Sequence, residues 1–312
     1  MIINGSQDNN LEKLDRYTTK ILSDMSMKSD YAMYDESLNF ILVEGQTEVT
    51  FFSKYKKSKN HFVEINEIVE SQKSMRARQE EGTFNNKKAI LNIVGNVFNL
   101  PFLQKKNIFG IVDKDFDKEY PYSQLHSRIF SNDTHDLETM MLDSDGNAAC
   151  NLRQIKCSKE NVSRALYMAY QIGLVKFAVS KFRHLRVVSE IDFNIYFSDD
   201  KLNIKKYISF INRDLNNDKK VVYADVVKVL KNMKKLDKDN NFNFDIKDFC
   251  DNISKEVWQI VNGHDFLFIL FHIYKVKTTK RKASEDLISA YKIANFENTA
   301  LFAKMKKAKL FA

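Results

Sequence analysis

Carboxylates that follow apolar runs are the residues of this sequence best suited to do chemistry. A first apolar run, NFILV, ends in Glu44, and a second acid, Glu48, follows four residues later. Another run, NIFGIV, ends in Asp113, and Asp115 follows two residues after that. Oxygen ligands of this kind suit Mg²⁺ or Mn²⁺, which retain water molecules and take substrate phosphates as further ligands. The spacing therefore predicts a site for metal-assisted phosphate chemistry.

Strands and helices are expected to alternate around these acids. The predicted strands are Asn39–Val43, His61–Asn66 and Asn107–Val112, and the predicted helices between them are Thr47–Lys57 and Lys87–Leu100. This β-α-β-α-β order predicts an α/β fold with a mostly parallel sheet and flanking helices. Because ligands of such sheets bind at the carboxyl ends of the strands, Glu44, Asp113 and Asp115 are predicted to meet at one edge. Three carboxylates this close repel one another unless a cation joins them.

The second half of the chain differs in pattern and in charge. From about residue 160 it consists of long amphipathic stretches, which predict a mainly α-helical C-terminal region. Residues 1–150 contain 18 Lys and Arg against 23 Asp and Glu, a net charge of −5, whereas residues 151–312 contain 31 against 18, a net charge of +13. We therefore predict three parts: an N-terminal helical segment at 1–37, a catalytic domain at 38–150 and a mainly helical basic domain at 151–312.

The basic half contains one segment that suits contacts with nucleic-acid phosphates. The stretch KVKTTKRK contains no acid, and a phosphate contact needs a base that is not already paired. Its candidate binding residues are Lys275, Lys277, Lys280, Arg281 and Lys282. Solvated faces of a lysine-rich protein, or a surface for an acidic protein partner, are the alternatives.

Composition excludes several other classes of protein. The three cysteines form no CxxC pair, so neither a disulfide framework nor a zinc site is indicated, and reduced thiols in a cytoplasmic protein are expected. The sequence has no apolar run long enough for a membrane span and no signal-peptide pattern at its N-terminus. It also lacks a P-loop, so any use of ATP would come from a partner.

The pair of motifs "ILVEG" and "IVDKD" resembles the Toprim domain, the metal-binding catalytic fold of topoisomerases, bacterial primases and OLD-family nucleases. The resemblance implies that Glu44 is the acid near the reacting phosphate and that Asp113 and Asp115 hold Mg²⁺. Glu48 is similar to an additional acid that OLD-type members carry four residues after the first. The resemblance covers about residues 38–145 and, with weaker motifs, residues 260–305.

Two further stretches, "THDLETMML" and "NGHDFLFILF", resemble a Toprim-like family known from bacterial anti-phage loci. One type is the Toprim effector of PARIS systems, which an ABC-type ATPase holds and releases when a phage protein is sensed. The resemblance implies a Mg²⁺-dependent endonuclease that acts as a toxic effector on RNA such as tRNA, as a homodimer when active. A DNA nuclease, or a non-catalytic docking module for the ATPase, are the alternatives.

Residues in these stretches have more than one interpretation. By resemblance Glu138 is a further metal ligand, but a capping acid after Thr134 explains it equally well. His264 and Asp265 form either a proton-transfer pair or part of a helix start beside Gly263.

Overall fold

The computed structural model describes the chain in separate stretches. They comprise residues 39–55, 60–65, 86–87, 90–91, 94, 107–114, 127–180, 196–213, 220–251 and 253–311. Contacts divide them into two compact units. Unit 1 contains the described residues up to Asp133 and those from Ile293 onward, and unit 2 is Thr134–Lys292. This division differs from the predicted one, because residues 134–150 group with the helical region and the residues from Ile293 onward group with the sheet. The predicted N-terminal segment at 1–37 lies outside the described residues.

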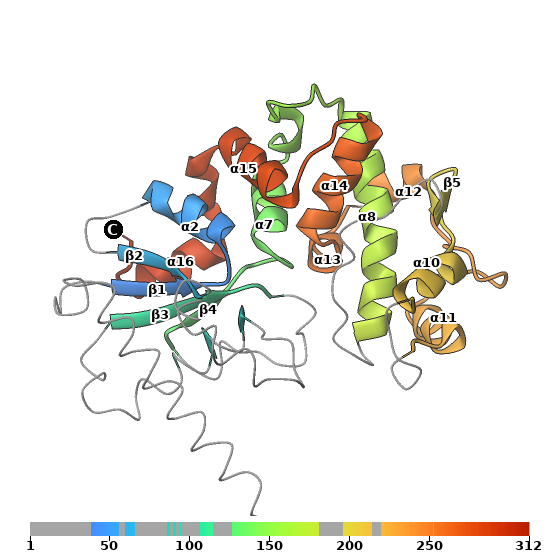
Figure 1. Ribbon diagram of the computed structural model, residues 1–312, viewed down its shortest axis with the longest axis horizontal. Coiled ribbons are helices and arrows are strands. Elements are labelled where there is room, and N and C mark those ends of the chain that lie inside the picture. Colours follow the sequence, from blue (N-terminus) through green and yellow to red (C-terminus); the bar gives the residue numbers. More distant parts are fainter. Residues whose placement is uncertain are drawn as a thin grey trace, which may run out of the picture. The chain divides into compact units, whose positions relative to one another are not determined.

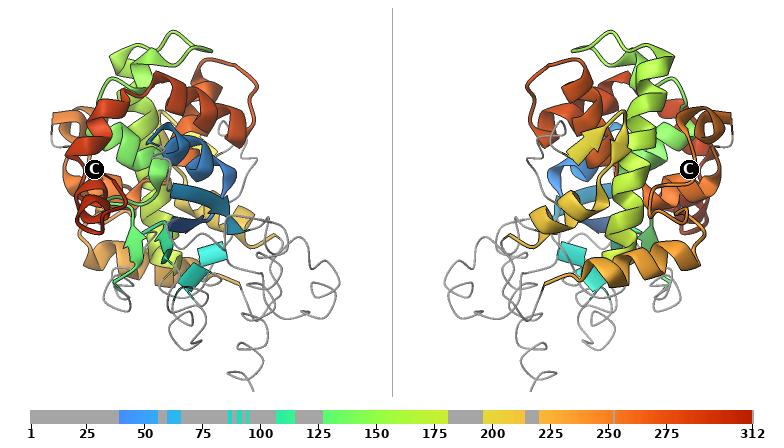
Figure 2. Two further views of the ribbon diagram at one scale, coloured as in Figure 1. Left: turned by 90° about the vertical axis from the view of Figure 1, so that its left-hand side faces the viewer. Right: turned by 90° about the vertical axis from the view of Figure 1, so that its right-hand side faces the viewer.

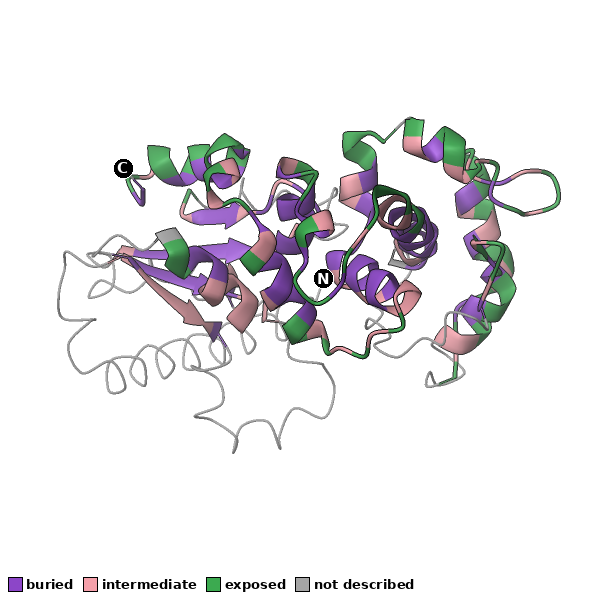
Figure 3. Ribbon diagram, turned by 90° about the horizontal axis from the view of Figure 1, so that it is seen from above, coloured by how far each residue is buried: buried purple, intermediate pink, exposed green. Residues whose placement is uncertain are grey.

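Unit 1 is built on a four-stranded parallel sheet with the order β2-β1-β3-β4 (Figure 1). Its strands are β1 (Asn39–Val43), β2 (Asn60–Glu64), β3 (Asn107–Val112) and β4 (Ile129–Ser131). The inner strands β1 and β3 are almost wholly buried, whereas most of β2 is intermediate in exposure (Figure 3). Continuous apolar strands of this kind are typical of parallel sheets covered on both faces. The predicted α/β class with a mostly parallel sheet is confirmed.

The predicted element bounds agree best for the inner strands. Both β1 and β3 have the predicted bounds, and β2 begins and ends earlier than predicted. Helix α2 (Gln46–Phe52) is shorter than predicted and continues into a 3₁₀ turn at Ser53–Tyr55. Strand β4 was not predicted, because three residues are too few to show a period. The helix predicted at Lys87–Leu100 is described only at residues 86–87, 90–91 and 94, which are helical.

The C-terminal part of the chain packs against the sheet of unit 1. It forms a 3₁₀ helix, η5 (Ile293–Asn298), and helix α16 (Ala300–Lys307), which lies beside β4 (Figures 1 and 2). The Phe296 ring meets that of Phe51 edge-on, with 5.2 Å between ring centroids. The Asp133 carboxylate accepts a hydrogen bond from the backbone N–H of Ala300 at 2.6 Å, at the start of α16. These contacts explain why the C-terminal segment belongs to unit 1.

Unit 2 is helical and is organised around α8 (Lys159–Ser180), which packs along α14 (Gly263–Ile273) (Figures 1 and 2). The other helices of this unit are α7 (Leu137–Ser144), η3 (Ala149–Asn151), α10 (Ile204–Ile211), α11 (Tyr223–Asn232), α12 (Ile246–Asp251), α13 (Lys255–Ile260) and α15 (Lys280–Ala290). A short hairpin joins β5 (Phe197–Ser198) to β6 (Lys201–Leu202). The predicted helical C-terminal region is confirmed. None of the helices that the structure describes is both long and apolar enough to cross a bilayer.

Candidate functional site

Three strand ends of unit 1 carry polar side chains at one edge of the sheet. Glu44 follows β1, Asp113 follows β3, and Asn132 follows β4. Because these strands are parallel neighbours, their carboxyl ends lie at the same edge, where ligands of α/β sheets bind. Glu44 and Asp113 are half-buried, and Asn132 is only 2% exposed.

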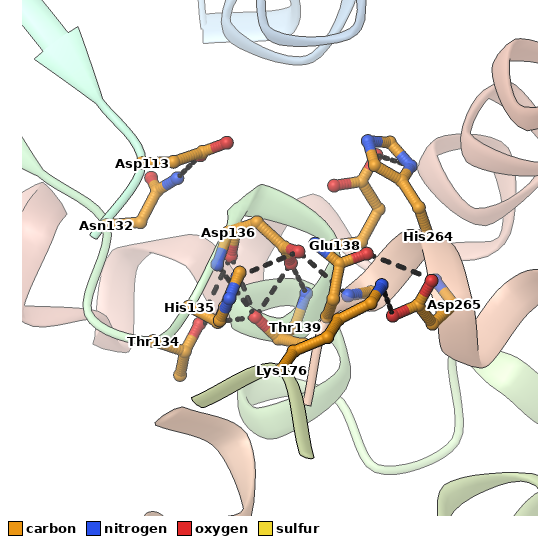
Figure 4. Close-up of polar contacts among 12 residues, drawn as sticks. Asp113, Asn132, Thr134, His135, Asp136, Glu138, Thr139, Lys176, His264 and Asp265 are labelled. Carbon is orange, nitrogen blue, oxygen red and sulfur yellow. Dashed lines mark hydrogen bonds and ion pairs between the residues drawn. The ribbon is translucent and has the colours of Figure 1, made fainter. Parts of the chain in front are cut away.

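Hydrogen bonds connect these three residues across the edge. Glu44 Oε1 accepts a hydrogen bond from the backbone N–H of Asp113 at 2.8 Å. Asp113 Oδ1 accepts one from Asn132 Nδ2 at 2.6 Å (Figure 4). Asn86 Nδ2 donates to the carbonyl oxygen of Glu44 at 2.7 Å, which anchors the first residue after β1. The structure therefore brings together Glu44 and Asp113, two of the residues that the sequence assigns to the metal site.

The oxygen of the Asn132 amide has no hydrogen-bond partner among the residues that the structure describes. Asn132 Oδ1 is buried and accepts no hydrogen bond from any described residue. Its orientation is set by Asp113, because a reversed amide would place an oxygen against the carboxylate. A buried acceptor without a donor costs about 1–3 kcal/mol. A cation or a donor at Oδ1 would remove this cost, and the amide and carboxylate oxygens present are of the kind that Mg²⁺ binds.

Sequence reasoning missed Asn132. The sequence signal is weak, because Ser131 separates Asn132 from the apolar pair Ile129 and Phe130, whereas Glu44 and Asp113 directly follow their apolar runs. The run is too short to be recognised as a strand without the neighbouring β3, with which it pairs.

Glu48 lies in the first turn of α2, as its spacing from Glu44 predicted. Its Oε2 atom lies 3.1 Å from the point where a Cβ on Gly45 would be, so a side chain at position 45 would crowd the carboxylate. Gly45 thus lets the Glu48 carboxylate approach the backbone just after β1. An acid in the first turn also interacts favourably with the positive end of the helix dipole.

The carboxylates of the described stretches do not form a metal cluster unaided. Within those stretches, no three His, Cys, Asp or Glu side chains gather closely enough to hold a metal ion. Asp115, the third acid of the predicted site, lies outside the described residues. Among the described residues, the candidate site therefore consists of two carboxylates, Glu44 and Asp113, with the Asn132 amide next to Asp113.

In unit 2, the two stretches THDLETMML and NGHDFLFILF contact each other. Asp136 is the N-cap of α7 and forms a capping box with Thr139, from whose backbone N–H it accepts a hydrogen bond at 2.9 Å. Its second oxygen accepts one from the backbone N–H of Gly263 at 2.8 Å (Figure 4). A Cβ on Gly263 would lie 2.3 Å from the Cβ of Glu138, so only glycine allows α14 to begin here. The capping acid is therefore Asp136 rather than Glu138.

Glu138 is 2% exposed and has partners in the same unit. Its Oε1 atom accepts a hydrogen bond from Ser284 Oγ at 2.7 Å and lies 3.5 Å from His264 Nδ1. The His264 side chain is 33% exposed. Ser284 Oγ also lies 3.5 Å from His264 Nδ1, so Ser284 and Glu138 meet the same ring nitrogen. In a catalytic relay the two would face opposite nitrogens. The role of Glu138 as a metal ligand stays a prediction.

The charged groups around Asp136 and Asp265 are paired. Burial raises the pKa of Asp136, but the hydrogen bond and charge of His135, the charge of His264 and the Thr139 N–H outweigh it and lower this pKa to about 2. Asp265 forms a buried ion pair with Lys176 of α8 (Figure 4). Asn262 caps α14 by accepting from the Asp265 N–H. The structure therefore favours the helix-start interpretation of this stretch, with Asp265 bound to Lys176.

The predicted phosphate-binding residues lie between α14 and α15 and in the first turn of α15. Lys275, Lys277 and Lys282 are exposed. Arg281 Nε donates to Glu285 Oε1 at 2.8 Å, so this base has an acidic partner one turn further along. Burial lowers the pKa of Lys280, and the charge of Asp265, which raises it, only partly offsets this effect. The role of these five residues in nucleic-acid binding stays a prediction.

No model of a known protein family matches the chain, and no curated protein or solved structure matches it either.

Proposed function

We propose that the protein is a divalent-metal-dependent nuclease whose site is centred on Glu44, Asp113 and Asn132. One relationship carries this proposal. Asp113 lies between the Glu44 carboxylate and the Asn132 amide, and the buried oxygen of that amide lacks a donor among the described residues. Carboxylate and amide oxygens are the ligands that Mg²⁺ and Mn²⁺ prefer. Asp115 and Glu48 are further candidate ligands on sequence grounds.

Each residue has a separate task in this proposal. When bound, Mg²⁺ or Mn²⁺ would stabilise the negative charge that develops on a phosphate during its transfer. Asp113 is the principal ligand, and Asn132 Nδ2 orients its carboxylate while Oδ1 completes the ligand set. The Asp113 amide fixes the Glu44 carboxylate, which then takes a proton from the attacking water or holds a second ion.

The proposed substrate is a nucleic acid. The net charge of +13 over residues 151–312 supports a polyanion as the ligand of this chain. On the resemblance of the motifs alone, RNA such as tRNA is the preferred substrate in this proposal. On the same ground, the protein acts as the toxic effector of an anti-phage system and is restrained by an ATPase. DNA is the alternative substrate.

The proposal is tested by cleavage of RNA and DNA by the purified protein. Labelled tRNA, single-stranded RNA and double-stranded DNA are incubated with the wild type, Glu44→Gln and Asp113→Asn, in Mg²⁺, Mn²⁺ or EDTA. We expect metal-dependent cleavage by the wild type, loss of at least about 100-fold in both variants, and preference for RNA. Glu297→Gln is the matched control, because Glu297 is an exposed acid of the same unit.

Two results would overturn the proposal. Cleavage that persists in both variants would show that the activity does not use this edge. A folded wild type that cuts none of the three substrates with either metal would instead favour the docking-module alternative.

A further inference from the structure

A second feature of unit 2 lies on α10, which contributes no residue to the proposed chemistry. Residues along α10 and just beyond its ends, together with Tyr196, border a pocket of about 450 Å³. This volume falls within the range of small-molecule sites, about 300–1,000 Å³. The pocket is lined by Tyr196, Asn203, Lys205, Lys206, Ser209, Phe210 and Arg213.

The two sides of α10 differ sharply. Ile204, Tyr207 and Ile208 are buried and hold the helix against the unit. Lys206 and Phe210 are four residues apart, so they lie on one face of the helix, and they border the pocket. The helix is thus fixed by one face and presents cations with an aromatic ring on the other.

The charge of the pocket is of one sign. Lys205, Lys206 and Arg213 are exposed, and no Asp or Glu is among the described residues that line the pocket. Neither lysine forms an ion pair within the described stretches. Three cations grouped without an acid favour an anionic ligand, and phosphate is the anion that lysine and arginine most readily bind.

The aromatic side chains add a second requirement. The rings of Tyr196 and Phe210 have centroids 5.2 Å apart and are tilted against each other, and the Arg213 guanidinium lies 5.5 Å from the Phe210 centroid. Phe210 is half-buried, so part of its ring remains accessible. Tyr196 is buried, so Phe210 is the ring of this pair left to a ligand. An aromatic ring next to cations is the combination that binds unstacked nucleobases together with their phosphates.

We infer that this pocket binds a nucleotide unit, with its phosphate on Lys205 and Lys206 and its base against Phe210. The unit belongs either to a single-stranded nucleic acid or to a free nucleotide. This inference rests on and deepens the proposed nuclease function, because the pocket would bind the class of substrate proposed for it, but binding can be measured without cleavage.

The test measures binding by the full chain in EDTA, where no metal-dependent cleavage occurs. Fluorescence anisotropy of a labelled single-stranded RNA is followed against protein concentration at several salt concentrations. We expect Lys205→Gln/Lys206→Gln to lower the slope of log affinity against log salt by about 1.4, which corresponds to two single-strand phosphate contacts. Phe210→Ala should weaken binding roughly 5- to 100-fold, as loss of one stacked base does. Phe210→Leu should also weaken binding, because leucine is apolar but has no ring on which a base can stack.

A matched control lies on the neighbouring helix α11, where Lys228 and Lys231 are exposed. Lys228→Gln/Lys231→Gln removes the same charge, and we expect it to change the affinity and the slope less. Equal effects of the two double variants, or unchanged binding in Lys205→Gln/Lys206→Gln and Phe210→Ala, would overturn the inference.

Competition separates the two sources of the nucleotide unit. Displacement of the RNA by AMP, but not by inorganic phosphate or adenosine, would identify a free-nucleotide site, whereas failure of all three would identify the strand. Variants that still cleave RNA with unchanged binding would contradict the pocket and leave the nuclease proposal standing. If the pocket variants lose RNA binding but the wild type cleaves no substrate, the pocket inference stands and the nuclease proposal is contradicted.

Discussion

Glu44 Oε1 accepts a hydrogen bond from the backbone N–H of Asp113 at 2.8 Å, so a side chain that follows β1 is bound to the residue that follows β3. The bond needs only an oxygen acceptor at position 44. In Glu44→Gln the amide oxygen can keep the bond while the negative charge is removed. The charge and the geometry of this edge can therefore be separated by one substitution.

The first prediction concerns stabilisation by metal. Without metal, Glu44→Gln should be as stable as the wild type or more stable, because a repulsion between carboxylates is removed. Mn²⁺ at 100 times its Kd should stabilise the wild type by about 2.7 kcal/mol and the variant much less. Thermal unfolding with excess Mn²⁺ and with EDTA measures both effects. Glu297→Gln should respond as the wild type does, and an equal response of Glu44→Gln would contradict the role assigned to Glu44.

Asn132 gives a second prediction. Asn132→Ala removes a hydrogen bond to a carboxylate, worth about 1.5–3 kcal/mol, and also a buried acceptor without a donor, which costs about 1–3 kcal/mol. These two effects nearly cancel, so with EDTA its free energy of unfolding should differ little from that of the wild type. The stabilisation by Mn²⁺ should fall, because a ligand oxygen is lost.

Asn132→Asp should behave in the opposite way. It places a second carboxylate against Asp113, so it should be destabilised with EDTA by about 2 kcal/mol and recover when Mn²⁺ is added. Urea unfolding under both conditions distinguishes the two variants. Asn132 is not a metal ligand if Mn²⁺ stabilises Asn132→Ala as much as the wild type and does not restore the stability of Asn132→Asp.

The sequence predicted the inner sheet well and the outer parts less well, for physical reasons. The bounds of β1 and β3 follow from apolar runs that are buried on both faces, and each run ends at the acid that marks the edge. Asn132 could not be found in this way, because β4 is three residues long and is defined by its pairing with β3. The association of the C-terminal segment with the sheet depends on contacts such as Phe51 with Phe296, which no local pattern encodes.

The contact between the two helix starts of unit 2 gives a third prediction. A Cβ on Gly263 would lie 2.3 Å from Glu138 Cβ and 2.7 Å from Asp136 Oδ1, so Gly263→Ala must displace α14 from α7. Overpacking of this kind costs about 1–3 kcal/mol. Gly146→Ala is the control, since nothing lies within 4 Å of its added Cβ. Urea unfolding should show a loss for Gly263→Ala only, and equal stability of the two variants would refute the close contact.

Asp136 gives the last prediction, a dependence of stability on pH. Its pKa is lowered to about 2 in the folded protein, against about 3.9 for an unperturbed Asp. An acid whose pKa is lower in the folded state stabilises the fold fully above its unfolded pKa, and this contribution is lost as the pH falls through the folded pKa. The contribution of the Asp136 charge should therefore be complete at pH 5 and should decline between about pH 4 and pH 2.

Asp136→Asn removes this charge, and the amide oxygen can still cap α7. Its Nδ2 then faces the N–H of Gly263, so part of the loss of stability is independent of pH, and only the part that varies with pH reports the charge. At pH 5 its free energy of unfolding should be lower than that of the wild type by about 2 kcal/mol, the scale of hydrogen bonds to a charged group. The difference should shrink as urea unfolding is repeated at successively lower pH. Asp239→Asn, which removes an exposed carboxylate of the same unit, should show no such trend. A difference between wild type and Asp136→Asn that stays constant from pH 5 to pH 2 would mean that the charge of Asp136 does not stabilise the junction of α7 and α14.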